Sequence, residues 1–310
     1  SGPTRPRITR LDWLRDSEHV VVRAVPAGRG PVPEESYVPA GPVVQENLGQ
    51  KAPARTLQDL LENAHDETLF DYYTTSQVHV VELDGDARAI GEPGVVSMMD
   101  PSPDGEYLLT RTIHRPYSYS LQEDRFPTRI EVWDLDRGEV AYEVADLPLQ
   151  DQIPLAFGSV ATGPRSVQWR SDEAAQLVWV EALDGGDGGA EAEERDRVFT
   201  LDAPFDEEPR PLITLANRFG GIIWGHDELA FVGSWWWATR NMRLWYVQPG
   251  DRDQEPRLVQ DRSWQDRYND PGRPLMHAGE YGRDVILTGD DDLTVFLHAD
   301  GASPEGDRPF

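Results

Sequence analysis

The chain has 310 residues, with 56 acidic and 29 basic side chains and a formal net charge of −27. A charge this negative repels phosphate backbones and anionic lipid surfaces, so we expect neither nucleic acid nor a membrane among the partners. Cysteine is absent, which excludes disulfides and thiol nucleophiles, whereas 38% hydrophobic residues and 27 glycines supply enough apolar material for a folded core.

The chain begins with SGPTRPR rather than with methionine, and we expect it to be a fragment of a longer protein. It contains no apolar run of 18 or more residues and no stretch with the pattern of a signal peptide. We therefore expect a soluble protein, with the cytoplasm slightly favoured over the periplasm or secretion.

Two short β-runs joined by a polar turn recur along the chain. This pattern occurs around Trp13, Asp100, Trp169 and Trp224. Further hairpin patterns start near Val78, Arg129, Arg197 and Arg243, and a fifth unit starts near Pro274. Repeated groups of four strands are typical of propeller blades. We predict an all-β fold, a partial β-propeller of about four to five blades of four-stranded antiparallel sheet, with an irregular β-sandwich as the alternative.

One segment has helical rather than strand periodicity. In TLQDLLENAHDETLFDYY apolar residues recur every three to four positions, and Thr56 with Asp59 forms a capping pair. We predict a short helical insertion over about 56–74 in the first blade. It either covers one end of the propeller or gates the entry of substrate. The glycine-rich acidic run from Leu183 predicts a hairpin loop.

Signatures of catalysis are missing from the sequence. The seven histidines lack metal-binding spacing, G-x-S-x-G does not occur, and no glycine-rich run has nucleotide-binding spacing. We therefore predict no catalytic residue, no metal site and no cofactor in this chain. The alternatives are a calcium loop in one of the acidic turns, and a serine site built from Ser159 or Ser166 with a distant histidine.

Three consecutive tryptophans, 235–237, precede Arg240 in the run SWWWATRNMRLWYV. Exposed rings of this kind stack on ligands or on arginine, whereas buried rings fill the space between twisted sheets. Trp236 and Arg240 are therefore candidate substrate-binding residues, with packing between blades as the alternative.

Several longer phrases are distinctive: ARTLQDLLENAHDETLFDYYTTSQ, SMMDPSPDGEYLL, IHRPYSY, LPLQDQIPLAFGSVATGPRSVQWR, RFGGIIW and DRSWQDRYNDPGRP. Together, and in this order, they resemble the propeller of the glutamyl endopeptidases, which belong to the prolyl oligopeptidase family of serine peptidases. The resemblance extends over most of the chain. It is more specific than the strand pattern alone.

The resemblance implies a two-domain serine peptidase. Residues 1–310 would be an incomplete N-terminal propeller that gates and guides peptides to a C-terminal α/β-hydrolase domain, absent from this chain, which carries Ser, Asp and His. The implied partners are peptide substrates and that hydrolase domain. Blades left without neighbours would also favour association with a second copy. The alternative is a free-standing propeller that acts as a protein-interaction module.

The resemblance also implies a preference for cleavage after glutamate. A cation must then meet the substrate carboxylate, and the planar guanidinium of arginine binds a carboxylate through two parallel hydrogen bonds. Arg115 in HRPYSY and Arg125 in RFP flank a segment without strand pattern. We name both as candidate substrate-binding residues, with salt bridges to surface acids as the alternative.

Overall fold

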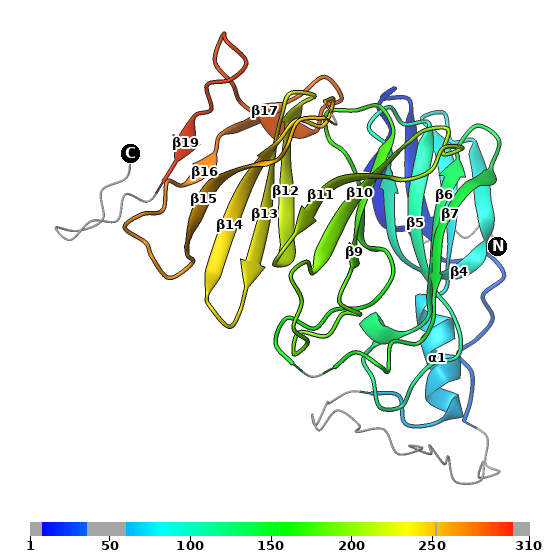
Figure 1. Cartoon of the computed structure of the whole chain (residues 1–310). Coiled ribbons are helices and arrows are strands. Elements are labelled where there is room, and N and C mark those ends of the chain that lie inside the picture. The colour runs from blue at the N-terminus through cyan, green and yellow to red at the C-terminus, as the bar shows by residue number, and fades with distance from the viewer. Residues whose placement is uncertain (1–7, 36–59, 155, 252, 300–310) are drawn as a thin grey trace. The chain divides into compact units, whose positions relative to one another are not determined.

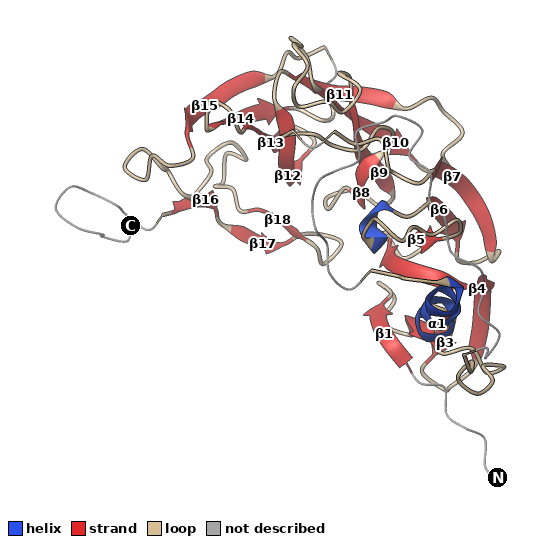
Figure 2. Ribbon diagram, turned by 90° about the horizontal axis from the view of Figure 1, so that it is seen from below, coloured by secondary structure: helices blue, strands red, loops and turns tan. Residues whose placement is uncertain are grey.

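The computed structural model describes residues 8–35, 60–154, 156–251 and 253–299 (Figure 1). The chain divides into two compact units, residues 1–152 and 153–310, which are described separately below. Strands make up nearly all the regular structure of the described residues, as the colouring of Figure 2 shows. No helix in these residues is both long and apolar enough to cross a membrane.

The first unit contains one antiparallel sheet in which each strand pairs with the next along the chain. Its strands are β1 (Ile8–Trp13), β2 (His19–Ala24), β3 (Ser76–Glu82), β4 (Ala87–Pro101), β5 (Tyr107–Ile113), β6 (Thr128–Asp134) and β7 (Glu139–Leu147). The first part of β4 pairs with β3 and its last part pairs with β5. The sheet therefore consists of two four-stranded halves that share β4.

The two halves of this sheet share one hydrophobic core. It consists of Leu14, Val21, Val78, Val80, Ile90, Val96, Met99, Leu108 and Leu135, with Trp133 packed against it. Burying one such aliphatic side chain contributes about 1.5–3 kcal/mol, so this cluster stabilises the unit substantially. Gly91 allows the bend in β4, since it has a φ of 61° and a Cβ there would lie 2.7 Å from the Trp133 ring.

Helix α1 (Ala64–Thr74) precedes β3 and is shorter than the predicted insertion over 56–74. The Oδ1 atom of Asn63 accepts hydrogen bonds from the next helical N–H groups, at 2.8 and 3.0 Å. Asn63 is thus the N-cap, and residues 60–63 are not helical, so the predicted start of the helix is wrong. The predicted capping pair, Thr56 and Asp59, lies outside the described residues.

The second unit contains two four-stranded antiparallel sheets, with strand orders β11-β10-β9-β8 and β12-β13-β14-β15. The strands are β8 (Arg165–Trp169), β9 (Gln176–Ala182), β10 (Asp196–Asp202), β11 (Arg210–Leu215), β12 (Arg218–His226), β13 (Leu229–Trp236), β14 (Asn241–Val247) and β15 (Arg257–Ser263). Four short strands follow and form two two-stranded pairs: β16 (Arg273–Pro274), β17 (Met276–Ala278), β18 (Asp284–Ile286) and β19 (Leu297–His298).

The two four-stranded sheets of this unit also share a core. Val178, Val180, Val198, Ile213 and Leu215 of the first sheet pack with Trp224, Ala230, Val232 and Val247 of the second. The first five residues of β9 are all buried, which is the pattern of a strand covered on both faces.

The predicted all-β class and the repeated four-stranded antiparallel sheets are confirmed. The described residues contain four groups of four strands, two in each unit, and only short strand pairs in the fifth repeat. The run from Leu183 is the loop between the antiparallel neighbours β9 and β10, as predicted. The assignment of residues 1–310 to a single propeller domain stays a prediction.

Candidate substrate-contacting sites

Arg115 follows β5 and is ion-paired to helix α1. Its Nη2 atom lies 2.7 Å from Asp71 Oδ2, and its Nη1 atom contacts a carboxylate oxygen of Glu67. The guanidinium also lies over the ring of Tyr117, 4.8 Å from its centroid. The hydrogen bond to Asp71 raises the pKa of Arg115 above its already high ordinary value, so this side chain is charged at neutral pH.

The same two carboxylates bind the tyrosines of the loop that follows Arg115. Tyr117 donates its hydroxyl to Asp71, and Tyr119 donates to Glu67 Oε1 at 2.7 Å. Burial, together with Asp71, raises the pKa of Tyr117, which keeps the hydroxyl protonated as a donor. The charge of Arg115 is therefore balanced within the chain, which matches the salt-bridge alternative; contact between Arg115 and substrate stays a prediction.

Arg125 is half-buried and ends the short 3₁₀ turn η1 (Glu123–Arg125). Its backbone is held in place, because Gln150 N–H donates to the Arg125 carbonyl at 2.9 Å. Within the described part of the chain its guanidinium has no carboxylate partner. Arg125 thus retains a charge that could meet a ligand, unlike Arg115.

Trp236, at the end of β13, has a cation over its ring. The guanidinium carbon of Arg195 lies 3.9 Å from the ring centroid. The same ring lies against Gly158, where an added Cβ would come within 2.9 Å of it. Trp236 therefore stacks on an arginine of this chain, which is the packing alternative, and its contact with substrate stays a prediction.

Beneath Trp236 three arginines share two buried aspartates. Arg218 is only 1% exposed. Its Nη2 atom lies 2.7 Å from Asp184 Oδ2, and its Nη1 atom lies 2.9 Å from Asp196 Oδ1. Arg195 Nη1 lies 2.8 Å from the same oxygen of Asp184, and Arg165 contacts Asp196. We call these five residues the buried ion network. They come from both sheets of the second unit and from the β9–β10 loop, so sequence spacing gave no signal for them.

Four aromatic rings form a continuous row on the second unit. Phe157 and Trp237 are stacked, with centroids 4.6 Å apart, and are 66% and 43% exposed. The ring centroid of Trp264 lies 5.7 Å from that of Trp237 and 6.3 Å from that of Trp235. We call these four residues the aromatic row. Flat exposed rings of this kind stack on rings, prolines or cations of a ligand.

Arg240 is exposed in the turn between β13 and β14, next to the aromatic row. It has a φ of 57°, and its carbonyl accepts a hydrogen bond of 3.0 Å from Trp264 N–H. The turn thereby fixes the backbone of Arg240 against Trp264. The structure brings the backbone of Arg240 to Trp237 and Trp264. The ring of Trp236 contacts Arg195 instead.

Three acidic residues of the second unit lie close enough together to form a candidate site for a metal cation. Asp172, Glu173 and Asp227 have carboxylate oxygens within 4.8 Å of one another. However, the buried guanidinium of Arg170 lies 2.9 Å from both Asp172 Oδ1 and Asp227 Oδ1. Burial alone would lower the pKa of Arg170, but its hydrogen bonds to Asp172 and Asp227 raise it overall. Arg170 therefore supplies the positive charge that this cluster needs.

No serine hydroxyl of the described residues is hydrogen-bonded to a histidine ring. Ser159 Oγ accepts a hydrogen bond from Gly188 N–H at 3.1 Å, and Ser166 has a left-handed φ of 53° without such a partner. Neither serine has the adjacent base that activates a nucleophile.

No protein-family model matches the chain. Two curated relatives match it along 96% of its length: the "Probable glutamyl endopeptidase, chloroplastic" of Oryza sativa subsp. japonica, 42% identical over 304 residues, and the protein of the same name of Arabidopsis thaliana, 40% identical over 305 residues. The chain spans 32% of the length of each relative. The resemblance to glutamyl endopeptidases is therefore confirmed. The preference for the cytoplasm gains no support, because these relatives are named as chloroplastic.

Solved structures of peptidases also match. The acylaminoacyl peptidase of Pyrococcus horikoshii is 13% identical, with a TM-score of 0.40 over 84% of this chain and 34% of its own. Dipeptidyl peptidase 4 of Porphyromonas gingivalis is 11% identical, with a TM-score of 0.42 over 97% of this chain and 42% of its own.

Proposed function

We propose that the chain is the substrate-guiding propeller part of a serine peptidase of the glutamyl endopeptidase type. The premise is that 96% of its length is related to a segment of the glutamyl endopeptidases. The observation that carries the proposal is the identity of 40–42% to one third of each relative. The repeated four-stranded sheets agree with a propeller. The catalytic Ser, Asp and His would lie in a hydrolase domain outside these 310 residues.

The proposed role is to admit and orient peptides rather than to cleave them. A propeller placed over an active site excludes folded proteins by size, so that only short or unstructured peptides reach the nucleophile. The aromatic row supplies flat faces against which an extended peptide can stack. Arg240, on the same unit, supplies an exposed cation for its acidic side chains, and the half-buried Arg125 is a separate candidate on the first unit.

The chain alone is proposed to hydrolyse nothing. Acyl transfer requires an activated nucleophile, a base within hydrogen-bond reach and donors for the oxyanion. In the described residues no serine hydroxyl is hydrogen-bonded to a histidine ring that would activate it, as Ser159 illustrates. The chemistry is therefore assigned to the proposed hydrolase domain.

The test compares the 310-residue chain with the longer parent protein. Both are treated with a serine-reactive fluorophosphonate and assayed on a terminally blocked glutamyl peptide. We expect labelling and cleavage only for the parent. Labelling of one serine in the 310-residue chain, with turnover that its mutation abolishes, would overturn the non-catalytic assignment. A parent protein that cleaves no glutamyl peptide would overturn the peptidase assignment.

The alternative is a protein-interaction module, and one observation favours it. A hollow of about 620 Å³ lies between the second sheet of the second unit and the short terminal strands. It is lined mainly by apolar side chains, among them Phe231, Leu244, Val259 and Leu293. Apolar hollows of this kind are common at protein interfaces. A parent protein that lacks hydrolase activity but binds a protein through this hollow would favour the alternative.

A further inference from the structure

The first unit contains a hollow that the proposed function does not use. It has a volume of about 310 Å³ and is lined by residues 91–94, at the bend of β4, and by parts of β5 and β6. Its floor is apolar, because Val78, Ile90 and Val96 of the core line it together with Trp133. Pockets for small ligands have volumes of about 300–1,000 Å³ and mostly apolar walls with a few polar groups. We call this feature the β4 hollow.

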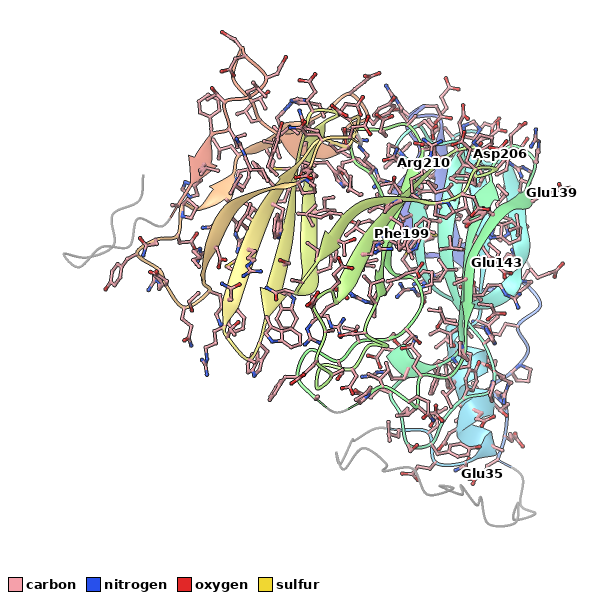
Figure 3. All side chains as sticks on the ribbon, viewed as in Figure 1. Glu35, Glu139, Glu143, Phe199, Asp206 and Arg210 are labelled. Carbon is pink, nitrogen blue, oxygen red and sulfur yellow. The ribbon has the colours of Figure 1, made fainter. Side chains whose placement is uncertain are left out.

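Two carboxylates lie side by side on the face of the sheet that borders the β4 hollow. Glu131 of β6 lies opposite Thr110 of β5 and opposite Glu143 of β7. Residues directly opposite in antiparallel strands share a face, and two like charges in these positions repel each other. Glu131 lines the hollow and is half-buried, whereas Glu143, labelled in Figure 3, is 55% exposed. The pairing of these strands therefore concentrates negative charge beside the hollow.

The cations near Glu131 are engaged with other carboxylates. Arg129 Nη2 lies 3.0 Å from Asp146 Oδ2, and Arg129 Nε lies 3.9 Å from Glu143. His114 Nε2 lies 2.7 Å from the other carboxylate oxygen of Asp146. In the part of the chain that the structure describes, no basic side chain lies within ion-pair distance of Glu131. Burial raises the pKa of Glu131, although the charge of Arg129 opposes this shift. Glu131 is thus a half-buried carboxylate without a matching cation.

Apolar side chains adjoin Glu131 on the same face. Trp133 is two positions further along β6, so both side chains face the hollow, and it lies opposite Val140 of β7. Val140 also lines the hollow and is 42% exposed. Glu92, at the bend of β4, adds an exposed carboxylate to the lining. The β4 hollow therefore combines an apolar wall and an indole ring with a negatively charged end.

We propose that the β4 hollow binds a small organic cation, a primary ammonium on an apolar body. The ammonium pairs with Glu131, and the apolar body covers Val140 and Trp133, whose ring also attracts a cation. The net charge of −27 favours a cationic ligand over an anionic one. A free amine and the side chain of a lysine in a peptide share this chemistry. The inference goes beyond the proposed function and does not depend on it.

The experiment titrates the 310-residue chain with phenethylamine in a calorimeter at neutral pH. The neutral analogue, phenethyl alcohol, has the same apolar body without the charge. We expect the amine to bind about tenfold more tightly, because a hydrogen bond to a charged group is lost with the alcohol. Equal affinity for the two compounds would overturn the proposal.

A terminally blocked peptide, Ala-Ala-Lys-Ala-Ala, distinguishes the two sources of the ammonium. Binding tighter than that of phenethylamine, and lost when norleucine replaces the lysine, would support the proposal with a lysine side chain as the occupant. Tighter binding of phenethylamine would support it with a free amine as the occupant. If neither compound binds, the proposal is wrong.

Two variants locate the site. Glu131→Gln should melt no lower than the parent chain, because the carboxylate has no ion pair, yet it should bind phenethylamine about tenfold more weakly and phenethyl alcohol unchanged. Val140→Ala should weaken the binding of both compounds about two- to fivefold, because it shortens the apolar wall. Unchanged affinities in both variants would overturn the assignment to this hollow.

The matched control separates a local site from general attraction to an acidic protein. Glu139→Gln removes the same charge from β7, opposite Asp134 and therefore on the other face of the strand pair from Trp133. It should leave the affinity for phenethylamine unchanged. An equal loss of affinity in Glu131→Gln and Glu139→Gln would mean that the net charge alone attracts the amine, and it would overturn the proposal.

Discussion

At the scale of single residues, the buried ion network shows why a core position can require a charge. Asp196 is fully buried and accepts hydrogen bonds from Arg218 Nη1 at 2.9 Å and from Phe219 N–H at 2.6 Å. It also contacts Arg165. Removing one member of such a network leaves a buried charge without compensation, which costs more than the pair contributes.

We therefore expect Asp196→Asn to lower the free energy of unfolding by about 3–5 kcal/mol. The matched control is Glu207→Gln, which breaks the exposed ion pair with Arg210, a residue on the surface of the same unit (Figure 3). Exposed pairs contribute about 0–1 kcal/mol, so the control should unfold almost as the parent does. Urea denaturation measures the free energy of unfolding of both variants. Equal decreases in the two variants would contradict a special role for the buried ion network.

His19 and Asp16 form a local pair whose effect depends on pH. His19 Nδ1 lies 2.6 Å from Asp16 Oδ2, and this hydrogen bond raises the pKa of His19. The stabilisation is complete below about pH 6.5, the ordinary pKa of histidine, and it is lost as the pH rises through the higher folded value. An NMR titration of the His19 ring should show the raised pKa. Asp16→Asn should return it to the ordinary range, while Glu82→Gln, whose oxygen is 3.9 Å away, should change it less.

The tryptophan run shows how far prediction from sequence reaches for individual residues. Successive strand residues point to opposite faces, so Trp236 must differ in environment from Trp235 and Trp237. Which face is covered depends on Arg195 and Gly158, which are distant in the sequence. The sequence therefore identified the aromatic segment correctly but could not tell which ring would be exposed.

At the scale of elements, α1 is held by polar and aromatic contacts rather than by a buried apolar face. None of its residues is fully buried. Phe70 packs edge-on against Tyr117, at 5.0 Å, and against Phe126, at 5.9 Å. The helical period was visible in the sequence, but its start was not, because Asn63 as N-cap competes with the earlier Thr56 and Asp59 pattern.

Arg115→Ala should loosen α1 without unfolding the sheet. The variant loses the ion pairs to Glu67 and Asp71, and since Arg115 is half exposed we expect α1 amides to exchange about two- to tenfold faster. Arg129→Ala is the control, because it breaks a comparable exposed pair with Asp146 that does not involve α1. Unchanged exchange in α1 would show that these ion pairs do not hold the helix.

At the scale of the whole molecule, the repeated strand pattern in the sequence was what predicted the fold. Each four-stranded group is built from neighbouring hairpins, so its pattern is local and could be predicted. In the fifth repeat the strands of the described residues, β16 to β19, are only two or three residues long. The buried ion network and the β4 hollow combine residues far apart in the sequence, and in so acidic a chain no spacing distinguishes a partnered carboxylate from a solvated one.

The short terminal strands leave apolar surface uncovered on the second unit, and this predicts association between copies of the chain. Val259 is 42% exposed and Leu293 is 61% exposed, and both line the apolar hollow beside β15. Covering such a patch removes apolar surface from water, at about 25 cal/mol per Å². We expect light scattering to show a mass that rises with protein concentration and falls back toward the monomer in Val259→Asp and Leu293→Asp. The control is Leu11→Asp, at a comparably exposed apolar position in the first unit, and it should leave the mass unchanged. If the parent chain is a monomer at every concentration, the prediction is wrong and the net charge of −27 outweighs this apolar attraction.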